Sequence, residues 1–277
     1  MGNGTVDAQW LEYRGAWQGA QAAVIEEALV TVYVNGIELA TIMCTPREQE
    51  ALALGFLKNE GLLETMEEIS AVTVSRNGCC VDVWLSHPIE RPRRVIITSG
   101  CGGGVTFDDP AVGISPLVDD TRLAPEKLHA LFNELQFPGS LYARARGVHA
   151  AGLTDGHVLL QVAEDVGRHN TIDKLLGLCL RQGIGTRGRI LLATGRVSSE
   201  MLRKGALMGC PIIASRNSPT SMSVAMARAW NVTLVGYVRR DSMRVYAHPE
   251  RLGYPESEEG PAMVLHASEP VRPGGVS

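Results

Sequence analysis

A single cysteine stands among four glycines in the stretch 98–104, which reads T-S-G-C-G-G-G. Glycine leaves backbone N–H groups uncovered and lets the chain adopt positive φ, so the amides of such a stretch can gather around an anion. A thiolate is an anion, and the stretch therefore suits a cysteine that ionises and reacts. The alternative is a glycine-rich turn that happens to contain a buried cysteine. Because reactivity more often than packing explains a retained free cysteine, we take Cys101 as the candidate nucleophile.

Polar residues follow three of the predicted strands, in the stretches 164–174, 194–200 and 215–221, and each stretch opens a predicted helix. Ligands of α/β sheets bind outside the carboxyl ends of the strands, and free N–H groups at a helix start favour an anion. None of the three matches the Walker A or G-x-G-x-x-G pattern, so they indicate a phosphate-bearing ligand but not ATP or NAD chemistry. The candidate donors to this ligand are Arg168, His169, Arg196 and Arg216.

Alternatives remain open for these polar stretches. The stretch 164–174 could also be a charged, well-capped helix start with Asp173 and Lys174 in solvent, although its density of mixed donors favours a site. A further basic stretch, 237–244, follows the last central strand and adds three arginines. Basic turns are common on protein surfaces, so this stretch alone does not distinguish a site from an ordinary turn.

His149 lies inside a predicted strand, where a histidine is more often a core residue than a ligand. Zinc deaminases combine an H-x-E motif with P-C-x-x-C. Here Ala151 takes the place of the glutamate, and Cys210-Pro211 has the reverse order with no partner cysteine. Zinc-dependent deamination is therefore disfavoured, and we expect no zinc.

The other cysteines show no metal or disulfide spacing. No C-x-x-C occurs in the chain, so a structural zinc site or a disulfide framework is not expected. Adjacent Cys79 and Cys80 begin a predicted strand. They could sense redox state, but ordinary strand packing is the favoured interpretation.

Composition excludes several classes of protein. The chain has 277 residues, of which 45% are hydrophobic and 20% charged, as in ordinary globular proteins. Its net charge of −4 does not favour sequence-independent nucleic-acid binding, so no nucleic-acid partner is expected. No apolar run is long enough to span a membrane, and the N-terminus lacks the regions of a secretory signal. A cytoplasmic protein without a membrane partner is the expectation.

The N-terminal part is predicted to be a small α+β domain of hairpins and helices, 24–110, that ends in the Cys101 stretch. Its turn signals are Asn35-Gly36 and Asn77-Gly78. The sequence T-P-R-E at 45–48 has the form of a capping box with proline at the first helical position, and predicts a helix to about Lys58. Residues 1–23 are expected to be loosely ordered, and 64–69 to form a second short helix.

The C-terminal part, 124–253, is predicted to be an α/β domain that binds the ligand, joined to the first by a linker at 111–123. An amphipathic helix opens it at 125–135, and strands then alternate with helices, which is typical of a sheet covered by helices. Asp155-Gly156 joins the first two strands as an antiparallel hairpin, so the sheet is mixed. The tail 254–277 is rich in Glu, Pro and Gly and is expected to be disordered. The predicted strands are 148–153, 158–163, 190–193, 212–214 and 233–237, and the helices 171–180, 199–207 and 221–230.

The chain resembles the formate dehydrogenase accessory proteins called FdhD, which are described as sulfur carriers or sulfurtransferases. The resemblance extends over about residues 28–252, and its most specific part is the string E-D-V-G-R-H-N-x-x-D-K that begins at Glu164. The other matching stretches are 98–104, 147–151, 194–196, 218–221 and 237–246.

The resemblance implies an activity, partners and a fold. The implied activity is that of a sulfurtransferase. Such a protein takes sulfur as a persulfide from a cysteine desulfurase and passes it to the molybdenum cofactor, bis-molybdopterin guanine dinucleotide. The sulfurated cofactor then serves formate dehydrogenase. The resemblance also implies a homodimer, and a C-terminal domain with a mixed three-layer α/β sheet resembling the cytidine-deaminase fold without its zinc. The persulfide cysteine of the family corresponds to Cys101. The cofactor-binding stretch corresponds to Tyr237, Val238, Arg239, Arg240, Asp241 and Ser242.

The chain lacks a second cysteine that many members of the family carry in this stretch, and this limits the possible sulfur-transfer mechanisms. Many members carry C-x-x-C where this chain has Cys101 and then Gly104. A disulfide relay within the stretch is therefore impossible, whereas a persulfide on one cysteine is not, because the same sulfur can be nucleophile and carrier. The alternative is a cofactor-binding chaperone without catalysis, in which Cys101 is only a loop residue.

Overall fold

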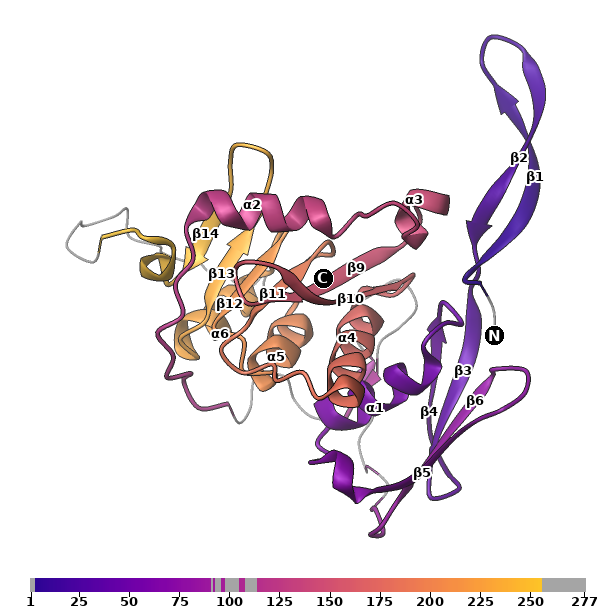
Figure 1. The fold of residues 1–277 in the computed structure, drawn as a ribbon, viewed down its shortest axis with the longest axis horizontal. Coiled ribbons are helices and arrows are strands. Elements are labelled where there is room, and N and C mark those ends of the chain that lie inside the picture. Colours follow the sequence, from indigo (N-terminus) through magenta and orange to yellow (C-terminus); the bar gives the residue numbers. More distant parts are fainter. Residues whose placement is uncertain (1–2, 91, 93–95, 98–104, 108–113, 256–277) are drawn as a thin grey trace, which may run out of the picture.

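The computed structural model describes residues 3–90, 92, 96–97, 105–107 and 114–255. Two sheets lie on either side of a layer of helices, and a long two-stranded ribbon projects from the body (Figure 1). In the part of the chain described, no helix is long and apolar enough to cross a membrane. Cys101 and the tail from residue 256 onward lie outside the described residues.

The larger sheet has six strands in the order β10-β9-β11-β12-β13-β14. Strands β11, β12 and β13 are parallel, and the remaining neighbours pair antiparallel, so the predicted mixed α/β sheet is confirmed. The hairpin at Asp155-Gly156 is confirmed as well, with Gly156 at a φ of 91°. The strands are β9 (His149–Thr154), β10 (Leu159–Asp165), β11 (Ile190–Ala193), β12 (Ile212–Ser215), β13 (Thr233–Gly236) and β14 (Arg244–Ala247).

Helices cover both faces of this sheet and make three layers. On one face lies α2 (Pro125–Glu134), whose Leu128 and Phe132 pack on the sheet. On the other face lie α4 (Arg168–Gln182), α5 (Ser199–Leu207) and α6 (Ser221–Ala229) (Figure 1). The resemblance to the cytidine-deaminase fold stays a prediction.

The smaller sheet has four strands in the order β4-β3-β6-β5. Both predicted hairpins are present, and Asn35 and Gly36 take φ values of 51° and 76° in the first turn. The second short helix is a single 3₁₀ turn, η1 (Met66–Glu68). The strands are β3 (Ala28–Val34), β4 (Ile37–Cys44), β5 (Ile69–Val74) and β6 (Cys80–Leu85).

Helix α1 (Gln49–Asn59) joins the smaller sheet to the larger domain by packing against α4. Glycines make this contact close. A Cβ on Gly55 would lie 1.8 Å from the carbonyl oxygen of Asp173, and one on Gly177 would lie 1.9 Å from that of Ala51. The two helix backbones therefore touch, which no larger side chain at these positions would allow.

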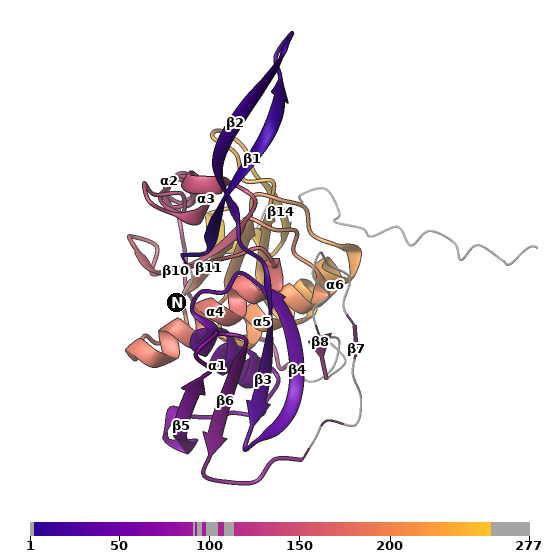
Figure 2. The same cartoon turned by 90° about the vertical axis from the view of Figure 1, so that its right-hand side faces the viewer.

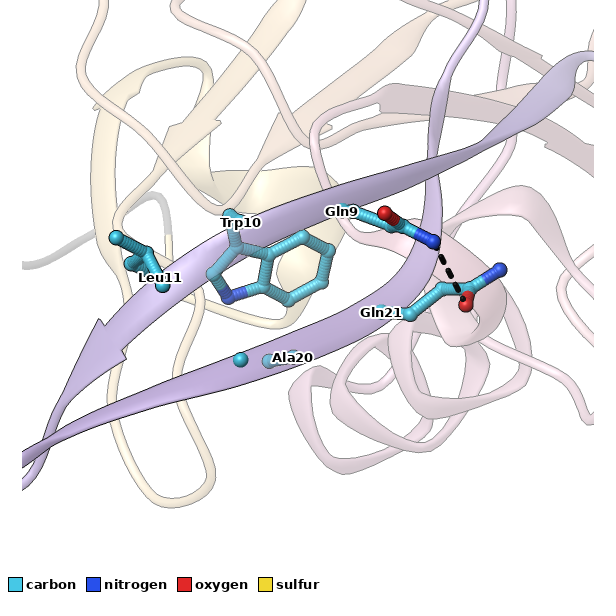
Figure 3. A pocket seen from close by; sticks show the side chains of 6 residues that line it. Gln9, Trp10, Leu11, Ala20 and Gln21 are labelled. Atoms are coloured by element: carbon cyan, nitrogen blue, oxygen red, sulfur yellow. Dashed lines mark hydrogen bonds between the residues drawn. The ribbon is translucent and has the colours of Figure 1, made fainter.

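The projecting ribbon consists of β1 (Thr5–Tyr13) and β2 (Trp17–Ile25), which pair along their whole length (Figure 2). The sequence-based expectation for 1–23 was loose order, whereas the structure pairs residues 5–25. The connection Arg14-Gly15-Ala16 carries no Asn-Gly or Asp-Gly signal, although Gly15 supplies the positive φ that the turn needs. In Figure 3, Trp10 and Ala20 lie opposite each other, beside a hydrogen bond of 3.4 Å from Gln9 to Gln21.

Short elements complete the fold. Strands β7 (Ile96–Ile97) and β8 (Val105–Thr106) pair antiparallel on either side of the Cys101 stretch. Helix α3 (Leu141–Ala145) begins at Ser140, whose hydroxyl accepts a hydrogen bond from the Ala143 N–H. A last 3₁₀ turn, η2 (Pro249–Leu252), follows β14.

Candidate functional site

The polar stretches of the larger sheet meet at one edge. Strands β10, β11, β12 and β13 all run in the same direction, so their carboxyl ends lie together. The start of β9 joins them, because His149 pairs with Asp165 and Ala151 pairs with Ala193. The prediction that the stretches 164–174, 194–200 and 215–221 share an edge is therefore confirmed. We call this the strand-end edge.

Backbone hydrogen bonds tie the second and third stretches into one unit. The Val197 N–H donates to the Ser218 oxygen at 3.0 Å, and the Thr220 N–H donates to the Val197 oxygen at 3.1 Å. The Ser215 hydroxyl donates to the Gly195 oxygen at 2.6 Å. Such mutual bonding makes the strand-end edge rigid.

Arg168 and His169 begin α4 and are buried at the strand-end edge. The His169 Nε2 lies 3.2 Å from the Ser198 hydroxyl and 3.4 Å from a Glu200 carboxylate oxygen. Burial, with the nearby cations Lys204 and Arg168, lowers the pKa of His169 to about 2. The imidazole is therefore neutral at physiological pH.

Because Gly195 has no side chain, the stretch 194–200 can pack closely against the stretch 164–174. A Cβ at this position would lie 2.8 Å from the Arg168 Cβ and 3.3 Å from the His149 Nδ1. His149 is half-buried, and burial followed by the charge of Arg168 lowers its pKa. The structure thus brings His149, Arg168 and His169 together, inside the edge rather than on its surface.

The exposed cations of the strand-end edge are elsewhere. Arg196, Arg239 and Arg240 are exposed, as are Asp241 and Ser242. The Arg239 N–H donates to the Ser242 oxygen at 2.8 Å, so these residues form a tight turn. Arg239, Arg240 and Asp241 are exposed on this turn, and the Arg239 guanidinium also donates to the Arg216 oxygen at 2.5 Å and to the Val238 oxygen at 3.1 Å.

Two other residues of the predicted cofactor stretch have different surroundings. Val238 is buried, and its N–H donates to the Ser215 oxygen at 3.0 Å. Tyr237 has a positive φ of 53°, and the Arg244 guanidinium lies 4.3 Å from the centre of its ring. Val238 thus fixes the exposed turn to the end of β12, while the Tyr237 ring packs against Arg244 at the start of β14.

Arg216 points away from these cations, toward the end of α2. Its guanidinium donates to the Phe132 oxygen at 3.0 Å and to the Asn133 side chain at 3.4 Å. It also lies 5.8 Å from the centre of the Phe132 ring. Arg216 therefore caps the carboxyl-terminal end of α2, where a cation interacts favourably with the helix dipole.

A buried ion pair at the start of α4 was not foreseen from the sequence. The Lys174 ammonium lies 2.6 Å from an Asp165 carboxylate oxygen, and neither side chain is exposed. The Asp165 carboxylate also accepts from the N–H groups of Thr45 and Gly167 and from the Asn170 side chain. The alternative in which Lys174 and Asp173 lie in solvent is therefore wrong for this helix.

The predicted capping box at 45–48 is also wrong. The N-cap of α1 is Glu48, which has a positive φ of 56° and makes no side-chain cap. Thr45 instead binds the larger domain: its hydroxyl accepts from the Val166 N–H at 3.1 Å, and its oxygen accepts from Lys174 at 2.9 Å. Tertiary hydrogen bonds to a buried ion pair have replaced the local cap.

A second buried group of charges joins α1, α4 and α5. The Lys204 ammonium lies 2.6 Å from the Asp173 carboxylate and 3.7 Å from that of Glu200. The Asn59 amide donates to the other Asp173 oxygen at 2.7 Å. Burial alone would lower the pKa of Lys204, but Asp173, Glu200 and Glu60 raise it overall, so the ammonium stays charged. We call these residues and His169 the buried polar network.

The described residues that flank Cys101 are anchored to this network. Ile97 pairs with Val105 across the stretch 98–104. The next two residues bind one oxygen of Glu60: the Thr106 hydroxyl donates at 3.0 Å and the Phe107 N–H at 2.8 Å. Burial raises the pKa of Glu60, while Lys204 and the Phe107 N–H oppose that change.

The remaining described cysteines differ in burial. Cys44, Cys179 and Cys210 are buried, and burial raises the pKa of each thiol. For Cys44 and Cys179 the pKa is raised to about 12, so neither is a thiolate at neutral pH. Cys79 and Cys80 are partly exposed.

Comparison with known proteins gives one consistent result. Residues 25–253 match the model of the FdhD/NarQ family. A protein of Bacillus subtilis named sulfur carrier protein FdhD is 35% identical over 249 residues, which are 88% of this chain and 95% of the relative. A protein of the same name from Staphylococcus haemolyticus is 34% identical over 235 residues, 82% of this chain and 89% of the relative.

A solved structure agrees with the sequence relatives. The crystal structure of a protein from Desulfotalea psychrophila, described as a formate dehydrogenase accessory protein, superposes with a TM-score of 0.78 at 29% identity. The match covers 90% of this chain and 99% of the other.

Proposed function

This chain belongs to the FdhD/NarQ family, and we propose that it carries sulfur as a persulfide on Cys101 and delivers it to the molybdenum cofactor used by formate dehydrogenase. The names of the relatives support a sulfur carrier, and the residues of this chain support the site. Three thiols are buried with raised pKa values, which leaves few candidates for a nucleophile. Cys101 is the candidate that lies among glycines.

The loading step is a thiol exchange with a cysteine desulfurase. The Cys101 thiolate attacks the outer sulfur of the donor persulfide, and a new S–S bond forms on Cys101. The donor S–S bond breaks, and the donor cysteine leaves as a thiolate. The outer sulfur keeps its proton, so no oxidant or reductant is required in this step.

The cofactor is the substrate, and the strand-end edge offers groups that fit it. Bis-molybdopterin guanine dinucleotide carries phosphates, and exposed Arg196, Arg239 and Arg240 can pair with them in charge-assisted hydrogen bonds. The exposed carboxylate of Asp241 can accept from the N–H groups of guanine. Buried Arg168 and His169 support the edge from inside.

The observation that carries the proposal is the link between the Cys101 stretch and this edge. Glu60 binds Thr106 and Phe107, which follow the stretch, and it lies close enough to raise the pKa of Lys204. Lys204 pairs with Glu200, which lies 3.4 Å from His169 at the edge. One buried network thus connects the flank of the sulfur-bearing stretch to the platform for the acceptor.

The proposal includes the expected partners. The donor is a cysteine desulfurase, the recipient of the sulfurated cofactor is formate dehydrogenase, and the working unit is a homodimer in the cytoplasm.

The test is complementation of cells that lack their own accessory protein. With Cys101→Ala, formate dehydrogenase activity should be lost, because the sulfur atom proposed to carry the persulfide to the cofactor is removed. With the control Cys179→Ala, which removes a buried thiol, activity should be retained. Full activity with Cys101→Ala would instead support a cofactor chaperone.

A further inference from the structure

Cys79 and Cys80 are adjacent thiols at the start of β6, directly after the Asn77-Gly78 turn. Their sulfur atoms lie 3.6 Å apart, and both residues are partly exposed. The other described cysteines are buried. Within the part of the chain that the structure describes, this pair therefore holds the thiols that a reagent in solution can reach.

The two thiols have unequal surroundings. The Cys79 sulfur lies 3.6 Å from the Cys80 sulfur and 3.9 Å from the Ser75 hydroxyl, and both groups can donate to it once it ionises. These hydrogen bonds from Cys80 and Ser75 lower the pKa of Cys79. The same contact with Cys79 raises the pKa of Cys80. Cys79 is thus the thiol that ionises more readily, and in the structure its S–H donates to the Asn77 side-chain oxygen at 3.0 Å.

The two thiols could in principle bind a soft metal ion or exchange sulfur with a persulfide. A soft metal ion would require both sulfurs as thiolates, since the thiolate is the metal ligand. A nucleophile with a protonated thiol beside it suits exchange chemistry, in which one sulfur accepts a group and the other displaces it. Among the described residues, no group of three or more histidine, cysteine, aspartate or glutamate side chains could hold a metal ion, which favours sulfur transfer over metal binding at this pair.

Space for a donor adjoins the turn. A surface pocket of about 290 Å³ lies next to it, lined by Glu26, Pro46, Gln49, Ser75, Arg76 and Asn77. Its polar lining and Arg76 suit the polar end of a small persulfide or a short segment that carries one.

We propose that Cys79 and Cys80 form a second site for persulfide sulfur, in which Cys79 accepts the outer sulfur of a persulfide and Cys80 releases it as hydrosulfide. The inference rests on the proposed function, because it uses the same class of sulfur donor. It adds a dithiol to a chain whose Cys101 stretch has glycine in place of a second cysteine.

Both steps balance. The Cys79 thiolate attacks the outer sulfur of the donor persulfide, the donor leaves as a thiolate, and Cys79 becomes a persulfide. Cys80 then gives up its proton and attacks the inner sulfur, which is already near attack distance. A Cys79–Cys80 disulfide forms, and the outer sulfur leaves with both bonding electrons as hydrosulfide. A thiol reductant restores the two thiols for the next turn.

The Cys79–Cys80 pair and the described flank of the Cys101 stretch contact different ends of α1. Gly78 packs against Gln49 at the start of α1, where an added Cβ would lie 2.9 Å from the Gln49 amide nitrogen. Thr106 binds Glu60, just beyond the other end of the same helix. The 11 residues of α1 span about 16 Å at 1.5 Å per residue. The Cys79–Cys80 pair and the described residues that follow the Cys101 stretch therefore lie near opposite ends of α1.

The test uses the full chain with glutathione persulfide as the donor. Cys101→Ala is compared with the double variants that also carry Cys79→Ser or Cys80→Ser. Cleavage after arginine places Cys79 and Cys80 on peptide 77–93, and Cys101 on peptide 95–122, so mass spectrometry reports each site separately.

We expect Cys101→Ala to release hydrosulfide and to form a disulfide within peptide 77–93. The variant with Cys80→Ser should instead accumulate one extra sulfur on this peptide, and the variant with Cys79→Ser should remain unlabelled. The second site would be overturned if peptide 77–93 stayed unlabelled in every variant while peptide 95–122 of the wild type gained sulfur. The proposed function would then remain intact. Label on peptide 77–93 without any on wild-type 95–122 would keep the second site and contradict the carrier role of Cys101.

Discussion

The Asp165 carboxylate and the Lys174 ammonium lie 2.6 Å apart with both side chains withdrawn from solvent. Each also binds Thr45, which lies at the end of the smaller sheet: Asp165 accepts from its N–H, and Lys174 donates to its oxygen. The pair therefore fixes the smaller sheet to the start of α4, next to Arg168 and His169. The string E-D-V-G-R-H-N-x-x-D-K thus joins the two halves of the molecule as well as forming the edge.

Removing one partner of this pair should be costly. Lys174→Met leaves the Asp165 charge buried without its cation, and we expect a loss of about 3–5 kcal/mol in the free energy of unfolding. The control on the same helix is Arg181→Met, because Arg181 is 43% exposed and pairs with Glu50 at 3.3 Å. This control should cost less than about 1 kcal/mol. Denaturant unfolding measures both, and equal losses would contradict the structural role of Lys174.

Gly177 should resist even the smallest side chain. In Gly177→Ala, the new Cβ meets the Ala51 carbonyl oxygen of α1, which opposes the gain of about 1 kcal/mol that alanine brings to a helix. We expect a net loss of about 1–3 kcal/mol, as for other overpacked cores. Gly185→Ala is the control, since no atom lies within 4 Å of its added Cβ. A Gly177→Ala protein with an unchanged or higher melting temperature would show that the helices do not touch as described.

His169 should make the fold sensitive to acid. Its pKa in the folded state is about 2, far below the value of about 6.5 in an unfolded chain. Below about pH 6.5, His169 is protonated in the unfolded state but stays neutral in the folded state, so the free energy of unfolding falls as the pH falls. The expected contribution is about 1.4 kcal/mol for each pH unit between about 6 and 3. His169→Gln should lose less stability between pH 7 and pH 5 than the wild type, and parallel losses in denaturant unfolding would contradict a neutral buried imidazole.

The exposed turn after β13 should bind a guanine nucleotide. Guanosine diphosphate serves as the probe, because it carries the guanine and phosphates expected in the cofactor. Loss of a charge-assisted hydrogen bond costs about 1.5–3 kcal/mol, so Arg239→Ala with Arg240→Ala should raise the Kd at least about tenfold. Arg187→Ala is the control, since this exposed arginine precedes β11 and lies at the other end of the sheet. Equal affinity of both variants in calorimetry would exclude the turn as the phosphate site.

Local patterns in the sequence predicted the elements that local rules control. Asn35-Gly36 and Asp155-Gly156 gave the correct hairpins, because only residues that tolerate positive φ close such turns. Alternating strands and helices predicted the mixed sheet, and the rule for strand ends placed three polar stretches at one edge. The positions of Arg196 and Arg239 at that edge follow directly from it.

Contacts between distant residues could not be predicted in this way. Thr45 and Asp165 are 120 positions apart, and nothing near 45–48 indicates that a tertiary bond replaces the helix cap. The one available signal was the position of Asp173 and Lys174 between apolar neighbours of a helix that is buried on most sides. Arg216 likewise follows a strand end as expected, yet its partner is the end of α2, which the sequence does not reveal.

Whether Cys101 carries the sulfur can be measured by mass spectrometry of the wild-type protein after incubation with a cysteine desulfurase and cysteine. Peptide 95–122 contains Cys101 as its single cysteine and can be followed without interference from the Cys79–Cys80 pair. This peptide should gain the mass of one sulfur atom and lose it again on treatment with a thiol reductant. An unmodified peptide, in a reaction where the desulfurase itself carries a persulfide, would contradict the carrier role of Cys101.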